Sequence, residues 1–153
     1  MIFVTVGTHH QPFDRLLGAL ADLPGDELVV QYGPGAPPPG VNRAADYLPF
    51  DEMLACYAEA DKVITHAGVG SILCARRAGQ LPLVVPRRHD LGEHVDDHQA
   101  ELVRKLEPRG SVIAVWDTAD LAAAVTAAPS RSPVVAEAEP PLCPKVRAAL
   151  EGA

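Results

Sequence analysis

The chain has 153 residues, a hydrophobic content of 48% and a formal net charge of −7. This length suits one domain with a substantial core, and the hydrophobic content excludes a disordered protein. The acidic balance argues against non-specific nucleic-acid binding, and no apolar run approaches the roughly 20 residues that span a bilayer. A strand is predicted directly after Met1 and the three cysteines lack zinc spacing, so we expect no signal peptide and a reducing, cytoplasmic setting.

Short apolar runs alternate with helical segments along the chain. Strands are predicted at residues 2–6, 28–32, 45–48, 63–65, 83–85 and 111–115. Helices are predicted at residues 13–21, 71–78, 97–106 and 118–127, and Asp51 is the predicted N-cap of another. This alternation predicts an α/β fold, with a mainly parallel sheet covered by helices on both faces in three layers. Five prolines between residues 129 and 144 then precede a short predicted helix at 145–150.

A glycine-rich turn at residues 66–71 joins a predicted strand to the helix that follows it. Gly68 and Gly70 let a ligand approach the backbone closely, and Ser71 adds a hydroxyl donor. Free N–H groups and the helix dipole favour an anion at such a place. A third glycine of G-x-G-x-x-G would fall at Leu73, so this is not a dinucleotide fingerprint. The turn predicts a diphosphate cradle, and the alternative is an ordinary tight turn of a parallel sheet.

The carboxyl ends of parallel strands meet at one edge of a sheet, where ligands bind. The loops expected at that edge are residues 7–11, 33–40, 66–71 and 87–99. His9 and His10 lie in the first of these loops, and the last is rich in histidine and charge. We therefore expect the chemical face of the protein at this edge. Arg87 and Arg88 could face a phosphate or an acidic partner, or could be solvated.

Several motifs, in this order along the chain, resemble the glycosyltransferase family 28 C-terminal domain, which is the donor-binding half of GT-B glycosyltransferases. They are residues 4–8 with Phe13 and Asp14, residues 65–71, Pro82, Pro86 and residues 92–99. Within the family, the chain resembles PssE-type subunits of bacterial exopolysaccharide assembly. It also resembles the small catalytic subunit of the eukaryotic dolichol-linked N-acetylglucosamine transferase. The resemblance extends from residue 1 to Leu121.

The resemblance implies a Rossmann-like domain that binds a UDP-sugar. The diphosphate would be held at the 66–71 turn, the uracil at Leu48 and Phe50, and the sugar near His98 and Gln99. The full set of implied donor-site residues is Gly7, Thr8, Leu48, Phe50, His66, Gly68, Val69, Gly70, Ser71, His94, His98 and Gln99. His66 would stabilise the departing UDP as a cation or as an N–H donor.

The catalytic base and the ribose contact are less closely defined. His9 and His10 are the candidate catalytic residues, and the alternative is a base supplied by a partner. Related donor sites often have a glutamate that binds the ribose hydroxyls. This chain has Cys74 at that position, and a thiol is a poor hydrogen-bond acceptor. We interpret Cys74 as a packed thiol.

The histidines and carboxylates of residues 93–98 have spacings that could also bind zinc. We favour a sugar-contacting loop in which Asp96 or Asp97 caps the following helix. Because GT-B enzymes generally need no bound metal, we expect neither a metal nor a cofactor besides the UDP-sugar substrate.

The family implies a split enzyme. Residues 1–128 would be its nucleotide-sugar-binding domain, and residues 129–153 a tail packed on that domain. A membrane-anchored partner subunit would bind the acceptor at the inner face of the membrane. The enzyme would transfer a hexose to a polyprenyl-diphosphate-linked acceptor in exopolysaccharide synthesis. The alternatives are a non-catalytic nucleotide-sugar-binding or regulatory module and a nucleotide-sugar hydrolase or epimerase that acts alone. In isolation the chain could form a homodimer.

Overall fold

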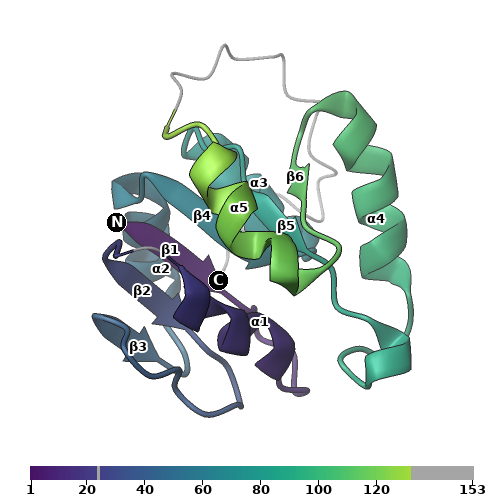
Figure 1. The fold of residues 1–153 in the computed structure, drawn as a ribbon, viewed down its shortest axis with the longest axis horizontal. Coiled ribbons are helices and arrows are strands. Elements are labelled where there is room, and N and C mark those ends of the chain that lie inside the picture. The colour runs from purple at the N-terminus through teal and green to yellow at the C-terminus, as the bar shows by residue number, and fades with distance from the viewer. Residues whose placement is uncertain (24, 132–153) are drawn as a thin grey trace.

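A computed structural model describes residues 1–23 and 25–131 (Figure 1). The described residues contain one six-stranded sheet in the order β3-β2-β1-β4-β5-β6, and every neighbouring pair is parallel. The strands are β1 (Ile2–Thr5), β2 (Leu28–Gln31), β3 (Arg43–Ala45), β4 (Lys62–His66), β5 (Leu83–Val85) and β6 (Ile113–Ala114). The predicted parallel sheet is confirmed.

Helices cover both faces of this sheet. They are α1 (Asp14–Ala19), α2 (Phe50–Glu59), α3 (Val69–Arg77), α4 (His98–Leu106) and α5 (Leu121–Ala127). Helices α1 and α5 share one hydrophobic cluster with the sheet and lie in front of it in Figure 1, whereas α2, α3 and α4 pack on the opposite face. The three-layer α/β prediction is therefore confirmed. Within the described residues, no helix combines the length and the apolar character needed to cross a membrane.

The alternation of side chains along each strand separates the two cores. In β1, Ile2 and Val4 join the cluster under α1 and α5, and Phe3 points to the other face. There the Phe3 ring meets the Tyr57 ring of α2 edge to face, with 5.0 Å between centroids. Such aromatic pairs stabilise a core beyond the area that they bury. This contact fixes α2 against the central strand.

The boundaries of several elements differ from the prediction. β3 was predicted at residues 45–48 but ends at Ala45, because Leu48 turns into the core beneath α2. The predicted Asp51 N-cap is wrong, since Phe50 already begins α2 and Asp51 lies in its first turn. In the first turn, the positive end of the helix dipole still stabilises the Asp51 carboxylate. Helix α3 begins at Val69, earlier than predicted. The helix predicted at 145–150 lies outside the described residues.

Arg87 joins the loops that follow β1 and β5. Its side chain is fully buried and lies 4.7 Å from the Phe13 ring centroid. Nη2 donates to the carbonyl oxygen of Val6 at 2.8 Å, and Nη1 donates to those of Gln11 at 2.9 Å and Glu93 at 3.1 Å. Arg87 is therefore a structural residue, whereas Arg88 is exposed and pairs with Asp90.

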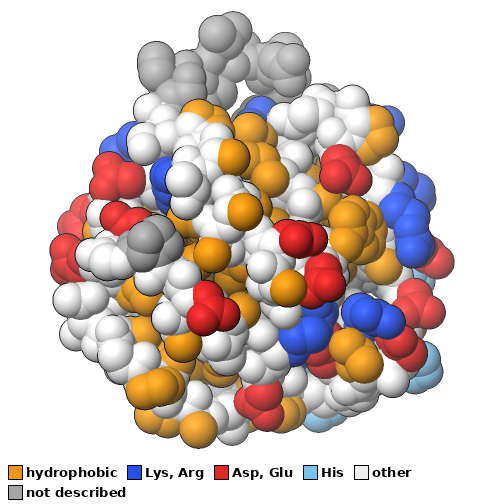
Figure 2. Space-filling view, in the orientation of Figure 1, with side chains coloured by type: hydrophobic (Ala, Val, Ile, Leu, Met, Phe, Trp, Pro, Cys, Tyr) orange, Lys and Arg blue, Asp and Glu red, His pale blue; other side chains and the backbone are white. Residues whose placement is uncertain are grey.

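The histidine side chains that are visible in Figure 2 lie at one edge of the molecule. Figure 2 shows acidic and basic side chains interspersed over the side of the molecule on which α1 and α5 lie in front of the sheet. Histidine side chains gather along the lower right edge of the same view, where the connections after β1 and β5 lie in Figure 1. The carboxyl edge of the sheet is thus the histidine-rich part of this view.

We expect the substitution Arg87→Met to lower the free energy of unfolding by about 3 kcal/mol, because several buried carbonyl groups would lose their donor. Urea denaturation at neutral pH measures this loss. The matched control is Arg88→Met, which removes a neighbouring but exposed guanidinium and should leave stability unchanged. Equal losses in the two variants would contradict the structural role of Arg87.

Candidate functional site

The first turn of α3 presents free backbone amides at the carboxyl edge of the sheet. Gly68 is the extended N-cap residue, and the first backbone hydrogen bond of the helix runs from Ile72 N to the Gly68 oxygen at 3.0 Å. The amides of Val69, Gly70 and Ser71 therefore have no intrahelical acceptor. A Cβ atom added to Gly70 would meet no atom within 4 Å, so the space beside this turn is open. Such a turn can receive an anion.

The imidazole of His66 fills the space between two glycines. A Cβ atom on Gly7 would lie 2.4 Å from His66 Cε1, and one on Gly68 would lie 2.2 Å from His66 Nε2. Gly7 also has a φ of +76°, which side chains rarely adopt. Gly68 was expected to let a phosphate approach the backbone. The His66 ring also requires that residue 68 has no side chain. The ends of β1 and β4 close around this ring.

His66 is a neutral group at physiological pH. Burial, and then the positive charge of Arg87, lower the pKa of His66 from 6.5 to about 3. Of the two predicted roles, cation or N–H donor, this lowered pKa favours the N–H donor. His66 Nδ1 lies 3.3 Å from the hydroxyl of Thr65.

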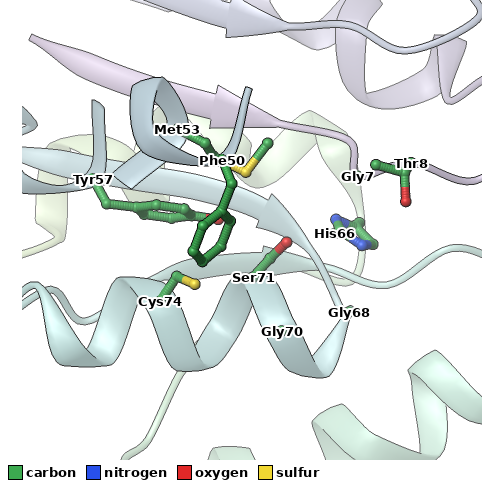
Figure 3. Close-up of a pocket in the computed structure, with 10 residues that line it drawn as sticks. All are labelled: Gly7, Thr8, Phe50, Met53, Tyr57, His66, Gly68, Gly70, Ser71 and Cys74. Carbon is green, nitrogen blue, oxygen red and sulfur yellow. The ribbon is translucent and has the colours of Figure 1, made fainter. Parts of the chain in front are cut away.

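A pocket of about 320 Å³ opens between α2 and the first turns of α3 (Figure 3). It brings together most of the implied donor-site residues with three others from α2 and α3. The lining residues are Gly7, Thr8, Phe50, Met53, Tyr57, His66, Gly68, Gly70, Ser71 and Cys74. In Figure 3 the Ser71 hydroxyl and the phenol end of Tyr57 point into the space between the two helices. A polar end at the α3 N-terminus thus adjoins a mainly apolar end.

Helix α2 supplies a wall of the pocket of which the sequence analysis named Phe50 but not Met53 or Tyr57. Phe50, Met53 and Tyr57 recur at helical spacing, so the signal was present, but an apolar stripe does not distinguish a core from a pocket wall. Leu48 was expected to border a base that its backbone could contact, and its side chain is 3% exposed within the core beneath α2. Only its backbone is left to contact a ligand.

His9 lies between two other imidazoles. Its ring centroid is 4.4 Å from that of His10 and 4.6 Å from that of His94. Burial, and then the neighbouring His94, lower the pKa of His9. His9 and His10 line a second pocket of about 310 Å³, which shares Gly7 and Thr8 with the first. The candidate catalytic residues are thus beside the candidate donor pocket.

The last loop is organised by side chains that bind within the protein. Gln99 Oε1 accepts from the amides of Ala67 at 3.2 Å and Arg87 at 3.0 Å, and so ties β4 to β5. Its amide nitrogen has no hydrogen-bond partner among the described residues. Asp96 accepts from His94 Nδ1 at 3.0 Å and from His98 Nδ1 at 2.6 Å.

The start of α4 is capped from this loop. Asp97 is the N-cap residue by backbone position, but its side chain makes no capping hydrogen bond; Asp96 Oδ1 accepts from the His98 backbone amide at 3.0 Å. Glu93 is buried and paired with Arg15, at 2.8 Å between Oε1 and Nε. In the part of the chain that the structure describes, no three His, Cys, Asp or Glu side chains are arranged to hold a metal ion.

Several protein families have a parallel sheet with an anion-accepting turn and a pocket at its carboxyl edge. Comparison of this sequence with known protein families distinguishes between them. The chain matches the glycosyltransferase family 28 C-terminal domain over residues 1–140. It belongs to this family. The predicted family resemblance is confirmed, and the chain is a domain of the glycosyltransferase class.

Two curated relatives show how far the similarity extends. "UDP-N-acetylglucosamine transferase subunit ALG13" of Yarrowia lipolytica is 30% identical over 134 residues, which are 77% of this chain and 66% of that protein. "UDP-N-acetylglucosamine--N-acetylmuramyl-(pentapeptide) pyrophosphoryl-undecaprenol N-acetylglucosamine transferase" of Ralstonia nicotianae is 42% identical over 72 residues, or 46% of this chain. The matched segment makes up only 19% of the Ralstonia protein's length.

A solved structure, the "Glycotransferase of kitacinnamycin", matches the fold. It superposes with a TM-score of 0.52 and 24% identity, over 99% of this chain and 38% of its own. At this identity the likeness concerns the fold alone. Together with the family match, it confirms the Rossmann-like domain of GT-B type.

The neutral state of His66 predicts a pH-dependent stability. Because the folded-state pKa is lowered from 6.5 to about 3, the unfolded chain binds the proton first, and stability is lost as pH falls through this window. Between pH 7 and pH 5, we expect the wild type to lose about 2 kcal/mol more than His66→Gln. Urea denaturation at each pH measures this difference.

Between pH 8 and pH 9, where His66 carries almost no proton in either state, the two proteins should show the same pH dependence. Equal losses between pH 7 and pH 5 would show instead that the imidazole protonates freely within the fold.

Proposed function

We propose that this chain is the UDP-sugar-binding catalytic subunit of a two-component GT-B glycosyltransferase. The observation that carries the proposal is the first turn of α3, whose free amides lie at a pocket lined by His66 and Gly70. The pocket volume of about 320 Å³ is in the range of small-molecule sites, about 300–1,000 Å³. The names of both relatives, which include UDP-N-acetylglucosamine, support a UDP-sugar as the ligand.

In the proposed reaction, an acceptor hydroxyl attacks the anomeric carbon of the bound sugar. A new C–O bond forms while the bond from that carbon to the UDP phosphate oxygen breaks, with inversion of configuration. The departing diphosphate gains negative charge, which the amides and dipole at the start of α3 stabilise. His66 contributes as a neutral ring, since its pKa of about 3 leaves it uncharged. The reaction as proposed uses no metal and no further cofactor.

The proton of the acceptor hydroxyl needs a base, and the two candidate histidines differ in their hydrogen bonds. His9 Nδ1 accepts from the Gln11 amide at 3.1 Å, so the proton of the neutral His9 ring is on Nε2. In that state His9 is a donor toward substrate. His10 is exposed and has no hydrogen-bond partner among the described residues, so a ring nitrogen can accept a proton. We assign the base to His10 and a donor contact to His9.

The proposed acceptor is a polyprenyl-diphosphate-linked sugar, and the proposed product a hexosyl-extended chain in exopolysaccharide synthesis. The "pyrophosphoryl-undecaprenol" in the name of the Ralstonia relative supports an acceptor of this chemistry. The word "subunit" in the name of the Yarrowia relative supports a partner chain. We propose that a membrane-anchored partner binds the acceptor and holds this chain at the cytoplasmic face of the membrane.

A non-catalytic nucleotide-sugar-binding module is the second candidate. The observation that favours it is Cys74, a buried thiol at the position where related donor sites often carry a glutamate. Such a module would bind the nucleotide without supporting transfer when the partner and acceptor are supplied.

We expect the purified chain to bind UDP, and a UDP-sugar among UDP-glucose, UDP-glucuronate and UDP-N-acetylglucosamine, with measurable heat in calorimetric titration. Gly70→Val should weaken UDP binding at least about tenfold, because its side chain fills the space beside the α3 amides. The matched control is Gly18→Val in α1, since a Cβ atom there also meets nothing within 4 Å. Gly18→Val should bind UDP as the wild type does.

The absence of UDP binding, both alone and with the co-expressed partner, would contradict the proposal. UDP binding with sugar transfer from the labelled donor would support the catalytic subunit. UDP binding without any transfer by the complete complex would favour the non-catalytic module.

A further inference from the structure

The hydroxyl of Tyr57 is a polar group without a partner at the inner end of the donor pocket. Tyr57 is 1% exposed and lines the pocket beside Ser71 and Cys74. Its oxygen makes no hydrogen bond with any described residue. Burial raises the pKa of Tyr57 and the neighbouring Ser71 hydroxyl opposes that rise, but the two hydroxyls do not meet in hydrogen-bonding geometry.

Such an unpaired hydroxyl lowers the stability of a folded protein. A buried polar group without a partner destabilises the fold, and a phenylalanine would form the same aromatic contact with Phe3 without that loss. Figure 3 shows the phenol end of Tyr57 directed toward the pocket, away from the backbone of α2. A ligand in the pocket can therefore supply the missing partner.

The position of Tyr57 relative to the α3 amides indicates which part of a nucleotide it would meet. If the diphosphate binds at Gly68 to Ser71, the ligand continues along α3 toward Cys74, which lies about 4.5 Å farther along the helix axis. The group that follows the phosphates of a nucleoside diphosphate is the ribose, which carries two hydroxyls. Cys74, on the facing helix, is a poor acceptor for them. Tyr57 and Ser71 are the hydroxyl-bearing side chains at that level of the pocket.

We propose that Tyr57 Oη hydrogen-bonds a ribose hydroxyl of the bound nucleotide and selects ribonucleotides over deoxyribonucleotides. This inference rests on the proposed function, because it takes the diphosphate to bind at the start of α3. Tyr57 acts here as a binding residue: it contacts the sugar of the nucleotide and takes no part in bond making or breaking.

The test compares UDP with 2′-deoxy-UDP and 3′-deoxy-UDP on the wild type and on Tyr57→Phe. The wild type should bind at least one deoxy analogue about tenfold more weakly than UDP. Tyr57→Phe should bind UDP about tenfold more weakly and lose the discrimination against that analogue. In thermal unfolding without ligand, Tyr57→Phe should be at least as stable as the wild type, because it removes only an unsatisfied group.

The matched control is Tyr32→Phe, which removes a hydroxyl from a tyrosine that packs on the opposite core. It should bind UDP and both analogues as the wild type does. Wild-type affinity and discrimination in Tyr57→Phe would overturn this inference and leave the proposed function standing. Failure of the wild type to bind UDP would overturn the proposed function, and the role of Tyr57 with it.

Discussion

The packing of the His66 ring between Gly7 and Gly68 is the constraint on which the carboxyl edge of the sheet depends. An imidazole of this size at the end of β4 requires two backbone segments without side chains, one after β1 and one before α3. The left-handed conformation of Gly7, with φ +76°, allows the first segment to turn at this point. The extended Gly68 places the first turn of α3 beside the same ring. One buried, neutral side chain thus sets the relative position of the two loops that line the pocket.

A second group of interactions ties the loop after β5 to this arrangement. Arg87 reaches from β5 to carbonyl groups after β1, and its charge contributes to keeping His66 neutral. Gln99 spans the ends of β4 and β5 through their amides. Buried guanidinium and amide groups with several backbone partners are costly to displace. The loops after β1, β4 and β5 are thus joined by buried hydrogen bonds, and His9, His10 and His94 lie in two of these loops.

The sequence predicted the features of the site that depend on local pattern. The strand, glycine turn and helix at 66–71 follow from neighbouring residues, and the parallel sheet from their alternation. Arg87 and Gln99 look like ligand-binding groups in the sequence, yet backbone groups from distant segments, such as Val6 at a separation of 81 residues, occupy their hydrogen bonds. Tyr57 shows the reverse case. Its helical spacing is typical of a core residue, and only the packing of α2 against α3 shows that its hydroxyl lacks a partner.

The hydrogen-bonding groups of this edge therefore fall into two sets with different consequences for a ligand. Those of Arg87 Nη1 and Nη2 and of Gln99 Oε1 have partners within the protein and hold the scaffold. The amides in the first turn of α3 and the Tyr57 hydroxyl have no such partner among the described residues, and their surroundings differ. The first turn at Gly70 is open, so water competes with a phosphate for its amides, whereas the Tyr57 oxygen is buried. A ligand that leaves a buried hydrogen-bonding group unpaired is rejected far more strongly than a ligand that does not contact a solvated group. Selectivity between ligands should therefore reside at the tyrosine end of the pocket, and recognition of negative charge at the amide end.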